Sequence, residues 1–261
     1  MLELDVNQIE RMVSTFLWPF FRVASFFMVI PMIGSRLLPV RIRLGLAIAV
    51  TVLLVPVLPE MPVFDGISGE NVVIILQQIL IGTIMGFVIQ VLFQVFVLGA
   101  QIAAMQMGLG FASTSDPANG VSVVILGQYY LMIVMMLFLV TNGHLIMIEV
   151  MVRSFTILPV GGESVATSSL FKVALAGTWL FSGAMMIALP AITALLVVNF
   201  SFGVMTRAAP QLNIFAIGFP FTMLMGLFIT WISMGDILDH YYKMTQFVLD
   251  YLTGLIVTES G

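Results

Sequence analysis

Two short motifs in the sequence carry residue types that could do chemistry. Ser169 and Lys172 form an S-x-x-K pattern, which supplies the nucleophilic serine of penicillin-binding enzymes, but the companion motifs S-D-N and K-T-G are missing. Gly108 and Gly110 begin a G-x-G pattern like that of a dinucleotide-binding turn. Ser113, however, stands where the third glycine is required, and no strand pattern precedes the motif. Chance explains the first match, and the second is better interpreted as a loop.

The ionisable residues that could bind a metal or transfer a proton are few and scattered. His144 and His240 lie far apart in the chain without a spaced third ligand, and there is no cysteine. Asp236 and Asp239 fall on adjacent helical turns, but paired catalytic carboxylates need a polar cleft that the sequence does not demonstrate. We therefore expect no metal and no cofactor, and these residues support a hydrolase only weakly. A net charge of −4 with only nine Lys and Arg also argues against nucleic-acid binding.

Arg22 is the charged residue in the least favourable setting, because it interrupts the apolar run 12–33. An unpaired charge inside an apolar segment is expensive and often marks an ion or proton pathway. A simpler interpretation is an arginine near a helix end that extends to the interface or pairs with an acidic residue such as Asp5. The sequence favours this second interpretation.

The composition sets the environment in which these residues must be held. Of the 261 residues, 61% are hydrophobic and 8% are charged, with a mean hydropathy of +1.15. Soluble domains carry about a quarter charged residues, so this chain predicts a membrane protein or a subunit buried in an apolar assembly. The acidic N-terminus does not look like a cleavable signal peptide, and we expect the first apolar segment to stay in the mature protein. The turn with Arg36, Arg41 and Arg43 is expected to face the cytoplasm.

The segment 71–107 contains neither proline nor a charged residue and predicts one long helix. A helix of about 36 residues would be about 54 Å long, whereas a hydrocarbon core of about 30 Å needs only about 20 residues. Its polar and small residues follow one helical line, along which we expect a partner helix or a water-filled channel, since amides facing lipid would be unsatisfied. This polar line consists of Thr83, Gly86, Gln90, Gln94, Gln101 and Gly108. Gly82 and Gly86 add a small-residue packing pair.

The segment 101–128 is the point around which the rest of the chain is organised. It joins the first long helix to a second one predicted over 121–152, in which Glu149 and Arg153 can pair four residues apart. Glycines, a proline and Asx residues concentrate in it, which is typical of a turn. The sequence therefore predicts a helical hairpin with a loop at its tip.

The C-terminal third predicts further apolar helices. Segment 170–206, which Pro190 is expected to kink, is followed by a break at 207–220 and then by segments 221–231 and 237–257. About six spans result. The predicted fold class is all-α, built from membrane-associated hairpins of long, kinked apolar helices.

Several motifs together resemble the FliR family of flagellar export-gate proteins, the flagellar branch of the R-type subunits of type III secretion. The strongest is R-A-A-P-Q-L-N-I-F-A-I-G-F-P at 207–220. L-F-L-V-T-N-G-H-L at 137–145, S-F-T-I-L-P-V-G at 154–161 and G-F-A-S-T-S-D-P at 110–117 match as well. The early pattern of Pro31, Gly34, Pro39, Arg41 and Arg43 extends the resemblance over nearly the whole chain.

The resemblance implies a structural channel subunit of the inner membrane and flagellar basal body rather than an enzyme. It implies a FliP-like part at 1–169, a FliQ-like hairpin at 170–261, and assembly with FliP, FliQ and FlhB and other basal-body proteins into a closed helical complex. It also implies a plug loop at about 107–122 that helps close the channel for unfolded flagellar proteins. The implied plug residues are Met107, Gly108, Gly110, Phe111, Asp116, Pro117, Asn119 and Gly120.

Further residues are expected to pack helices or support assembly. They are Gly82, Gly86, Gln90, Gln94, Gln101, Glu149, Arg153, Arg207, Pro210, Asn213, Gly218 and Pro220. The alternatives are a secondary transporter with proline-broken helices, an intramembrane hydrolase, and the equivalent subunit of a virulence secretion system. The chain shows no inverted repeat and almost no ionisable residue in its apolar segments for a coupling ion, which disfavours a transporter.

Overall fold

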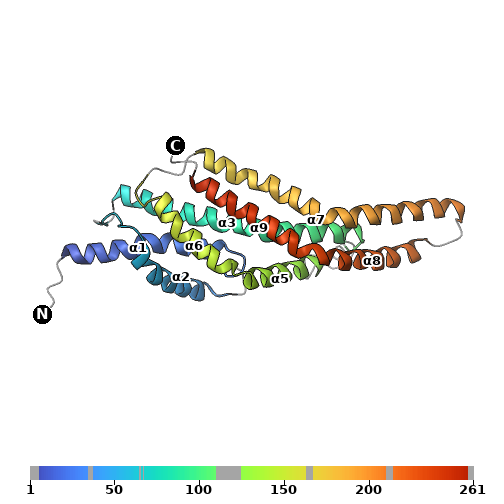
Figure 1. The fold of residues 1–261 in the computed structure, drawn as a ribbon, viewed down its shortest axis with the longest axis horizontal. Helices are drawn as coiled ribbons and strands as arrows, with labels where there is room; N and C mark the ends of the chain where they lie inside the picture. The colour runs from blue at the N-terminus through green and yellow to red at the C-terminus, as the bar shows by residue number, and fades with distance from the viewer. Residues whose placement is uncertain are drawn as a thin grey trace. The chain divides into compact units, whose positions relative to one another are not determined.

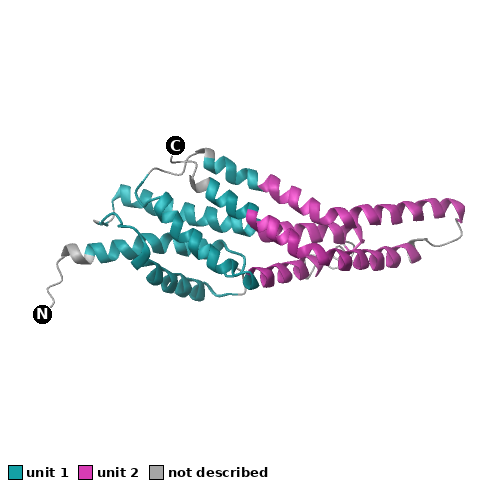
Figure 2. Ribbon diagram, in the orientation of Figure 1, with its two compact units in different colours: residues 1–91, 139–176, 247–261 teal, residues 92–138, 177–246 magenta. Residues whose placement is uncertain are grey.

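The computed structural model describes residues 6–34, 38–64, 66, 68–109, 125–162, 167–209 and 214–257. These residues are almost entirely helical, and none of them is in a strand, so the all-α prediction is confirmed (Figure 1). The chain divides into two compact units (Figure 2). Unit 1 comprises residues 1–91, 139–176 and 247–261, and unit 2 comprises residues 92–138 and 177–246.

Unit 1 is built mainly from α1 (Val6–Val29), α2 (Val40–Leu54) with the short helix η1 (Val55–Val57), and α6 (Gly143–Ile157). The first part of α3 (Gly69–Gln106), the start of α7 (Thr167–Ala208) and the end of α9 (Ile237–Val257) complete it. Its core is aromatic and aliphatic, with Trp18 fully buried and its Nε1 donating to the carbonyl oxygen of Pro62 at 2.9 Å.

Unit 2 contains the second part of α3, most of α5 (Ile125–Val140), most of α7, α8 (Ile214–Ser233), η3 (Met234–Asp236) and the start of α9. Phe93 and Phe96 of α3 are buried in it, and the ring of Phe93 lies 5.4 Å from that of Phe138 on α5. Gly99 provides a close approach, because a Cβ there would lie 2.9 Å from the carbonyl oxygen of Ala184 on α7.

The long helix predicted over 71–107 is confirmed, since α3 runs through 38 residues. Gly82 and Gly86 pack against α1 within unit 1. A Cβ at Gly82 would overlap the carbonyl oxygen of Arg22, and one at Gly86 would lie 2.9 Å from Cβ of Val29. The small-residue pair therefore lets the backbones of α1 and α3 approach closely, as such pairs do in membrane helices.

The second long helix, predicted over 121–152, is wrong as a single helix. α5 ends at Val140, α6 begins at Gly143, and the two are bent by 70°. Asn142 adopts the left-handed conformation at φ 56°, which asparagine tolerates better than most residues. Its carbonyl oxygen accepts the amides of Leu145 and Ile146, so Asn142 starts the new helix.

The break predicted at 207–220 is shorter than expected. α7 ends at Ala208 and α8 begins at Ile214, so Gly218 and Pro220 lie inside a helix rather than in a loop. Pro220 is in the second turn of α8, where its missing N–H removes one backbone hydrogen bond. The last two predicted segments are joined only by the short helix η3.

In the described part of the chain, five helical stretches are long and apolar enough to cross a membrane. They are Glu10–Val29, Val40–Val57, Gly69–Gln106, Ser169–Ala208 and Ile217–Gly254. The bent pair α5 and α6 would be a sixth if it counts as one span. The sequence-based expectation of about six membrane spans agrees with this upper value of six.

Candidate functional site

The end of α3 is shaped by a glycine cap, and it leads directly into the central loop. Gly108 has φ 83°, its amide donates to the carbonyl oxygen of Met105 at 3.0 Å, and the amide of Leu109 donates to Ala104 at 3.1 Å. This pair of bonds is the Schellman motif, in which a left-handed glycine ends a helix and satisfies its last carbonyl groups. The chain thus leaves α3 in a defined direction at the start of the predicted plug.

Met107 fixes this helix end within unit 2. Its side chain has no exposed surface and lies against the backbone of Gly226 on α8. A Cβ at Gly226 would overlap Cγ of Met107 and would lie 2.8 Å from its sulfur atom. Only a glycine at this position of α8 leaves room for the buried methionine.

Gly108, the next residue of the chain, also contacts α8. A Cβ on Gly108 would lie 2.7 Å from the ring of Phe219. Thr222 and Thr230 belong to the same stretch of α8, and their hydroxyl groups donate to the carbonyl oxygens of Phe219 and Gly226 at 3.0 and 2.8 Å. The base of the central loop is therefore held against α8, a helix that follows it by more than a hundred residues.

Most of the predicted plug residues lie outside the described residues, which omit 110–124. These are Gly110, Phe111, Asp116, Pro117, Asn119 and Gly120. On the far side of the loop the described chain resumes with α5, whose first residue Ile125 is strongly exposed. Of the predicted plug, the structure thus describes only the first residues, 107–109.

Methionines at both ends of the loop differ in exposure. Met107 is buried, whereas Met105 of α3 and Met132 and Met136 of α5 are exposed. Flexible, polarizable side chains of this kind fit irregular or changing surfaces. Both helices that flank the loop therefore expose methionines.

The residues of the polar line of α3 are only partly buried by other parts of the chain. Gly86 is buried, Thr83, Gln90, Gln101 and Gly108 are half-buried, and Gln94 is exposed. Gln94 stands out because the three residues on each side of it, 91–93 and 95–97, are all buried. The amide of Gln94 thus points away from the helices that pack on this part of α3, and the surface it presents is open to another molecule.

Arg22 is the site that sequence reasoning placed wrongly. It lies in the interior of α1 rather than near its end, and it has no exposed surface. Its Nε donates to Oε1 of Gln78 at 2.8 Å, and its two terminal nitrogens donate to Ser154 Oγ at 3.0 Å and to the carbonyl oxygen of Leu158 at 2.8 Å.

The guanidinium also lies 4.0 Å from the ring centre of Phe155, in cation–π geometry. All of these partners are uncharged, and Asp5, the acidic partner suggested by the sequence, lies outside the described residues. The arrangement links α1 to α3 and to the end of α6 within unit 1. The sequence signal was one isolated arginine in an apolar segment and the adjacent Gln77 and Gln78 in another, because buried polar groups must find partners.

The remaining predicted residues are dispersed. Arg153 and Glu149 pair at 2.7 Å, as predicted, but both side chains are exposed, and such pairs contribute little to stability. Arg207 is exposed on the last turn of α7, Gly218 is buried and Pro220 is exposed, while Pro210 and Asn213 lie outside the described residues. In the described chain no three His, Asp or Glu side chains are grouped closely enough to hold a metal ion.

Comparison with known proteins decides the family. A family model described as bacterial export proteins, family 1, matches residues 13–248. The chain belongs to this family. It is 38% identical over 229 residues to the flagellar biosynthetic protein FliR of Escherichia coli K12 and 34% identical to FliR of Pectobacterium carotovorum, each comparison covering 87% of both chains. FliR of Bacillus subtilis strain 168 is 25% identical over 222 residues, which cover 82% of this chain and 84% of the relative.

The resemblance to the FliR family is therefore confirmed. As a FliR-family member with several apolar helices long enough to span a bilayer, the chain is an inner-membrane component of the flagellar protein export apparatus. The family model covers both the buried arginine and the helix end held by Met107, since both fall within residues 13–248.

Proposed function

We propose that the chain is a structural channel subunit of the flagellar export gate and that residues 107–122 help close the pore to solutes. The observation that carries the proposal is the anchored base of the loop. Met107 is buried against Gly226 and Gly108 lies against Phe219, so the loop begins from a fixed point rather than from a frayed helix end. A closing element needs such a fixed base if its tip is to return to one position after each substrate has passed.

The proposed partners are FliP, FliQ and FlhB in a hetero-oligomeric gate complex, with unfolded flagellar proteins as substrates. Assembly with other subunits is supported by the exposed amide of Gln94 and the half-buried amides of Gln90 and Gln101. Such groups need hydrogen-bond partners when they leave water. A FliP-like part at 1–169 and a FliQ-like hairpin at 170–261 belong to the same proposal. We propose a mechanical rather than an enzymatic role.

The flagellar system is favoured over a virulence secretion system because the relatives reported above are all named as flagellar proteins. Membership in an export family likewise favours a protein channel over a secondary transporter or an intramembrane hydrolase.

Removal of residues 110–119 tests the plug directly. We expect the complex to assemble and the membrane to become permeable to ions or small solutes, because the anchored helix end remains while the closing segment is lost. Conductance of the purified complex in planar bilayers, or influx of a small dye into cells, measures the leak. Replacing the same ten residues by a Gly-Ser segment of equal length is the matched control for loop length.

The control should leak less than the deletion if chain volume contributes to closure. A deletion that abolishes assembly, with no leak from any complex that forms, would remove the support for a plug.

A further inference from the structure

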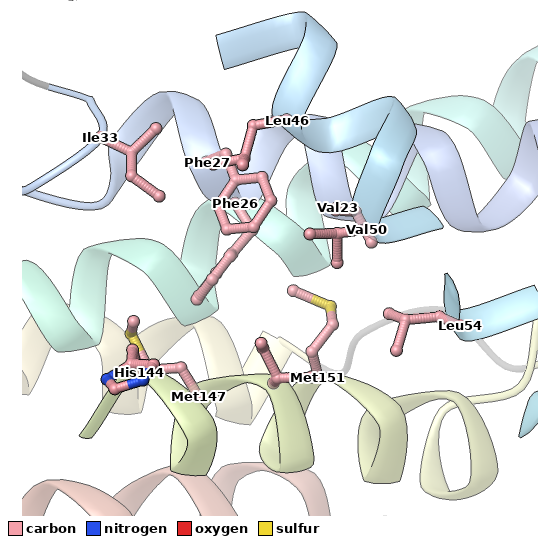
Figure 3. Close-up of a pocket in the computed structure, with 11 residues that line it drawn as sticks. Val23, Phe26, Phe27, Ile33, Leu46, Val50, Leu54, His144, Met147 and Met151 are labelled. Atoms are coloured by element: carbon pink, nitrogen blue, oxygen red, sulfur yellow. The ribbon is translucent and has the colours of Figure 1, made fainter. Parts of the chain in front are cut away.

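Unit 1 contains a partly open cavity of about 170 Å³ between α1, α2 and α6 (Figure 3). Three helices and the turn after α1 contribute its walls, and every lining side chain except that of His144 is apolar. The lining consists of Val23, Phe26, Phe27, Ile33, Leu46, Val50, Leu54, His144, Met147, Ile148 and Met151. Protein interiors seldom leave voids larger than a water molecule, so a space of this size is a candidate binding site.

The size and lining of the cavity define what it could hold. An engineered apolar cavity of about 150 Å³ stays dry and binds benzene. A cavity of similar volume with one imidazole in its lining therefore takes a hydrocarbon group of about six carbons in preference to water. A segment of a lipid acyl chain has this chemistry.

The helix that forms one wall of the cavity has an apolar outer surface. Outside the cavity face, α2 exposes Val40, Ile42, Leu44, Ile48, Val52 and Leu53. Together with its length and composition, which suit a membrane span, this surface is suited to contact with lipid. In that setting, acyl chains would lie beside the cavity.

Positive charge is concentrated at one end of the same helix. Arg41 and Arg43 lie in the first turn of α2, and α2 contains no acidic residue. Arg43 precedes Leu46, Val50 and Leu54 by three, seven and eleven positions, so it lies on the helical face that lines the cavity, one turn before it.

The first turn of α6 lies at the same end of the cavity. In Figure 3 His144 and Ile33 lie toward one end of the cavity and Leu54 toward the other. Nδ1 of His144 is buried and has no hydrogen-bond partner among the described residues. A phosphate group at this end would therefore lie near Arg43 and the imidazole of His144, while Arg41, in the same first turn of α2 but on another side of the helix, adds positive charge beside them.

We propose that this cavity binds an acyl chain of an anionic phospholipid whose phosphate lies at Arg41 and Arg43. Basic residues beside a gap between membrane helices are the usual recognition elements for anionic headgroups. Bound lipid would fill the space between α1, α2 and α6, and it would tie this part of unit 1 to the leaflet that carries the headgroup. The site is independent of pore closure by the central loop.

Native mass spectrometry of the purified full-length chain tests the proposal. The probes are phosphatidylglycerol and phosphatidylcholine with identical acyl chains, compared at equal concentration. We expect phosphatidylglycerol to be retained preferentially. Arg41→Gln and Arg43→Gln should each weaken its binding about fivefold, since one basic residue near an anionic lipid contributes about that factor. Equal retention of the two lipids by the unaltered chain would overturn the headgroup assignment.

Filling the cavity tests the acyl-chain assignment. Val50→Phe places a ring in the cavity, whereas Ala49→Phe adds the same group at an exposed neighbouring position of α2 as the matched control. We expect Val50→Phe to abolish binding of both lipids and Ala49→Phe to leave it unchanged. Undiminished phosphatidylglycerol binding by a well-folded Val50→Phe variant would overturn the proposal.

A second measurement uses the unaltered chain and so does not depend on variant folding. Phosphatidylglycerol with a diazirine in its acyl chain is photo-crosslinked, and the labelled peptides are mapped by mass spectrometry. Label concentrated at residues 40–57 and 143–157 supports the site. Label spread evenly over all apolar helices would overturn it, as would labelling that disappears in the assembled export apparatus, because another subunit would then fill the cavity.

Discussion

At the scale of single residues, the chain uses two kinds of specific contact that hydropathy does not reveal. One is a buried cation held by neutral partners, Arg22 with Gln78, Ser154 and Leu158. The other is a glycine that makes room for a side chain from a distant helix, Gly226 with Met107. The first links three helices of unit 1 and the second fixes the base of the central loop in unit 2.

Replacing Arg22 with leucine should destabilise the protein strongly. The change leaves Oε1 of Gln78 and the carbonyl oxygen of Leu158 without a donor, and each unsatisfied buried group costs about 1–3 kcal/mol. We expect a lower thermal midpoint by fluorescence-detected size-exclusion chromatography. Arg22→Lys should rescue only partly, because an ammonium group lacks the planar fork of donors.

Arg153→Leu is the matched control, since it removes an arginine from an exposed pair and should change stability by less than about 1 kcal/mol. Equal effects at the two positions would contradict the structural role of the buried arginine. The double change Arg22→Leu with Gln78→Leu should be less harmful than the sum of the single changes, because both partners of one hydrogen bond are then apolar.

The Met107–Gly226 contact predicts that substitutions at the two positions have coupled effects on stability, because the two residues share one space. Gly226→Ala overfills the space, for which about 1–3 kcal/mol of destabilisation is typical, and Met107→Ala leaves a cavity at a typical cost of about 2–5 kcal/mol. Since the added methyl group occupies part of the vacated space, the double variant should be more stable than additivity predicts. Thermal midpoints of the four proteins measure this coupling.

Gly45→Ala is the control, because a Cβ there meets no atom within 4 Å. Strict additivity of Met107→Ala and Gly226→Ala would show that the two residues do not share this space in the folded protein.

At the scale of helices, the sequence predicted the lengths of helices better than the positions at which they break. α3 was predictable because no proline or charge interrupts 71–107, and one polar line persists along it. The break before α6 was missed because apolar residues continue on both sides of it. The Asn142–Gly143 dipeptide, a common turn signal, was outweighed by this hydropathy.

The polar line of α3 predicts a role in assembly for its exposed amides. Gln94→Leu and Gln101→Leu should insert normally but reduce the amount of FliP and FliQ that co-purifies with the chain. The physical reason is that an amide which pairs with a partner helix cannot be replaced by an apolar side chain without leaving that partner unsatisfied. We expect the larger loss for Gln94, which is the more exposed of the two.

Gln106→Leu is the matched control, because Gln106 lies about 120° around the helix from Gln94. Unchanged complex yield and normal motility for Gln94→Leu and Gln101→Leu would argue that the polar line faces water instead of partner helices.

At the scale of the whole molecule, composition and motifs were sufficient for the fold class, the membrane location and the family. They could not supply long-range contacts. Arg22 and Leu158 are 136 residues apart, and nothing in the local pattern around either residue names the other. Met107 and Gly226 are similarly distant, and a glycine in an apolar helix gives no sign of which side chain occupies the space beside it.

The bend at Asn142 has a consequence for how the chain is threaded through the bilayer. If α5 and α6 together make one passage, the described residues contain six candidate passages, and an even number places the two ends on the same side of the bilayer. If the pair enters and turns back, the number is five and the ends emerge on opposite sides. Whether the pair bent at Asn142 crosses the bilayer thus decides if the number of passages is odd or even, and with it the compartment in which a reporter enzyme fused to the C-terminus would be active.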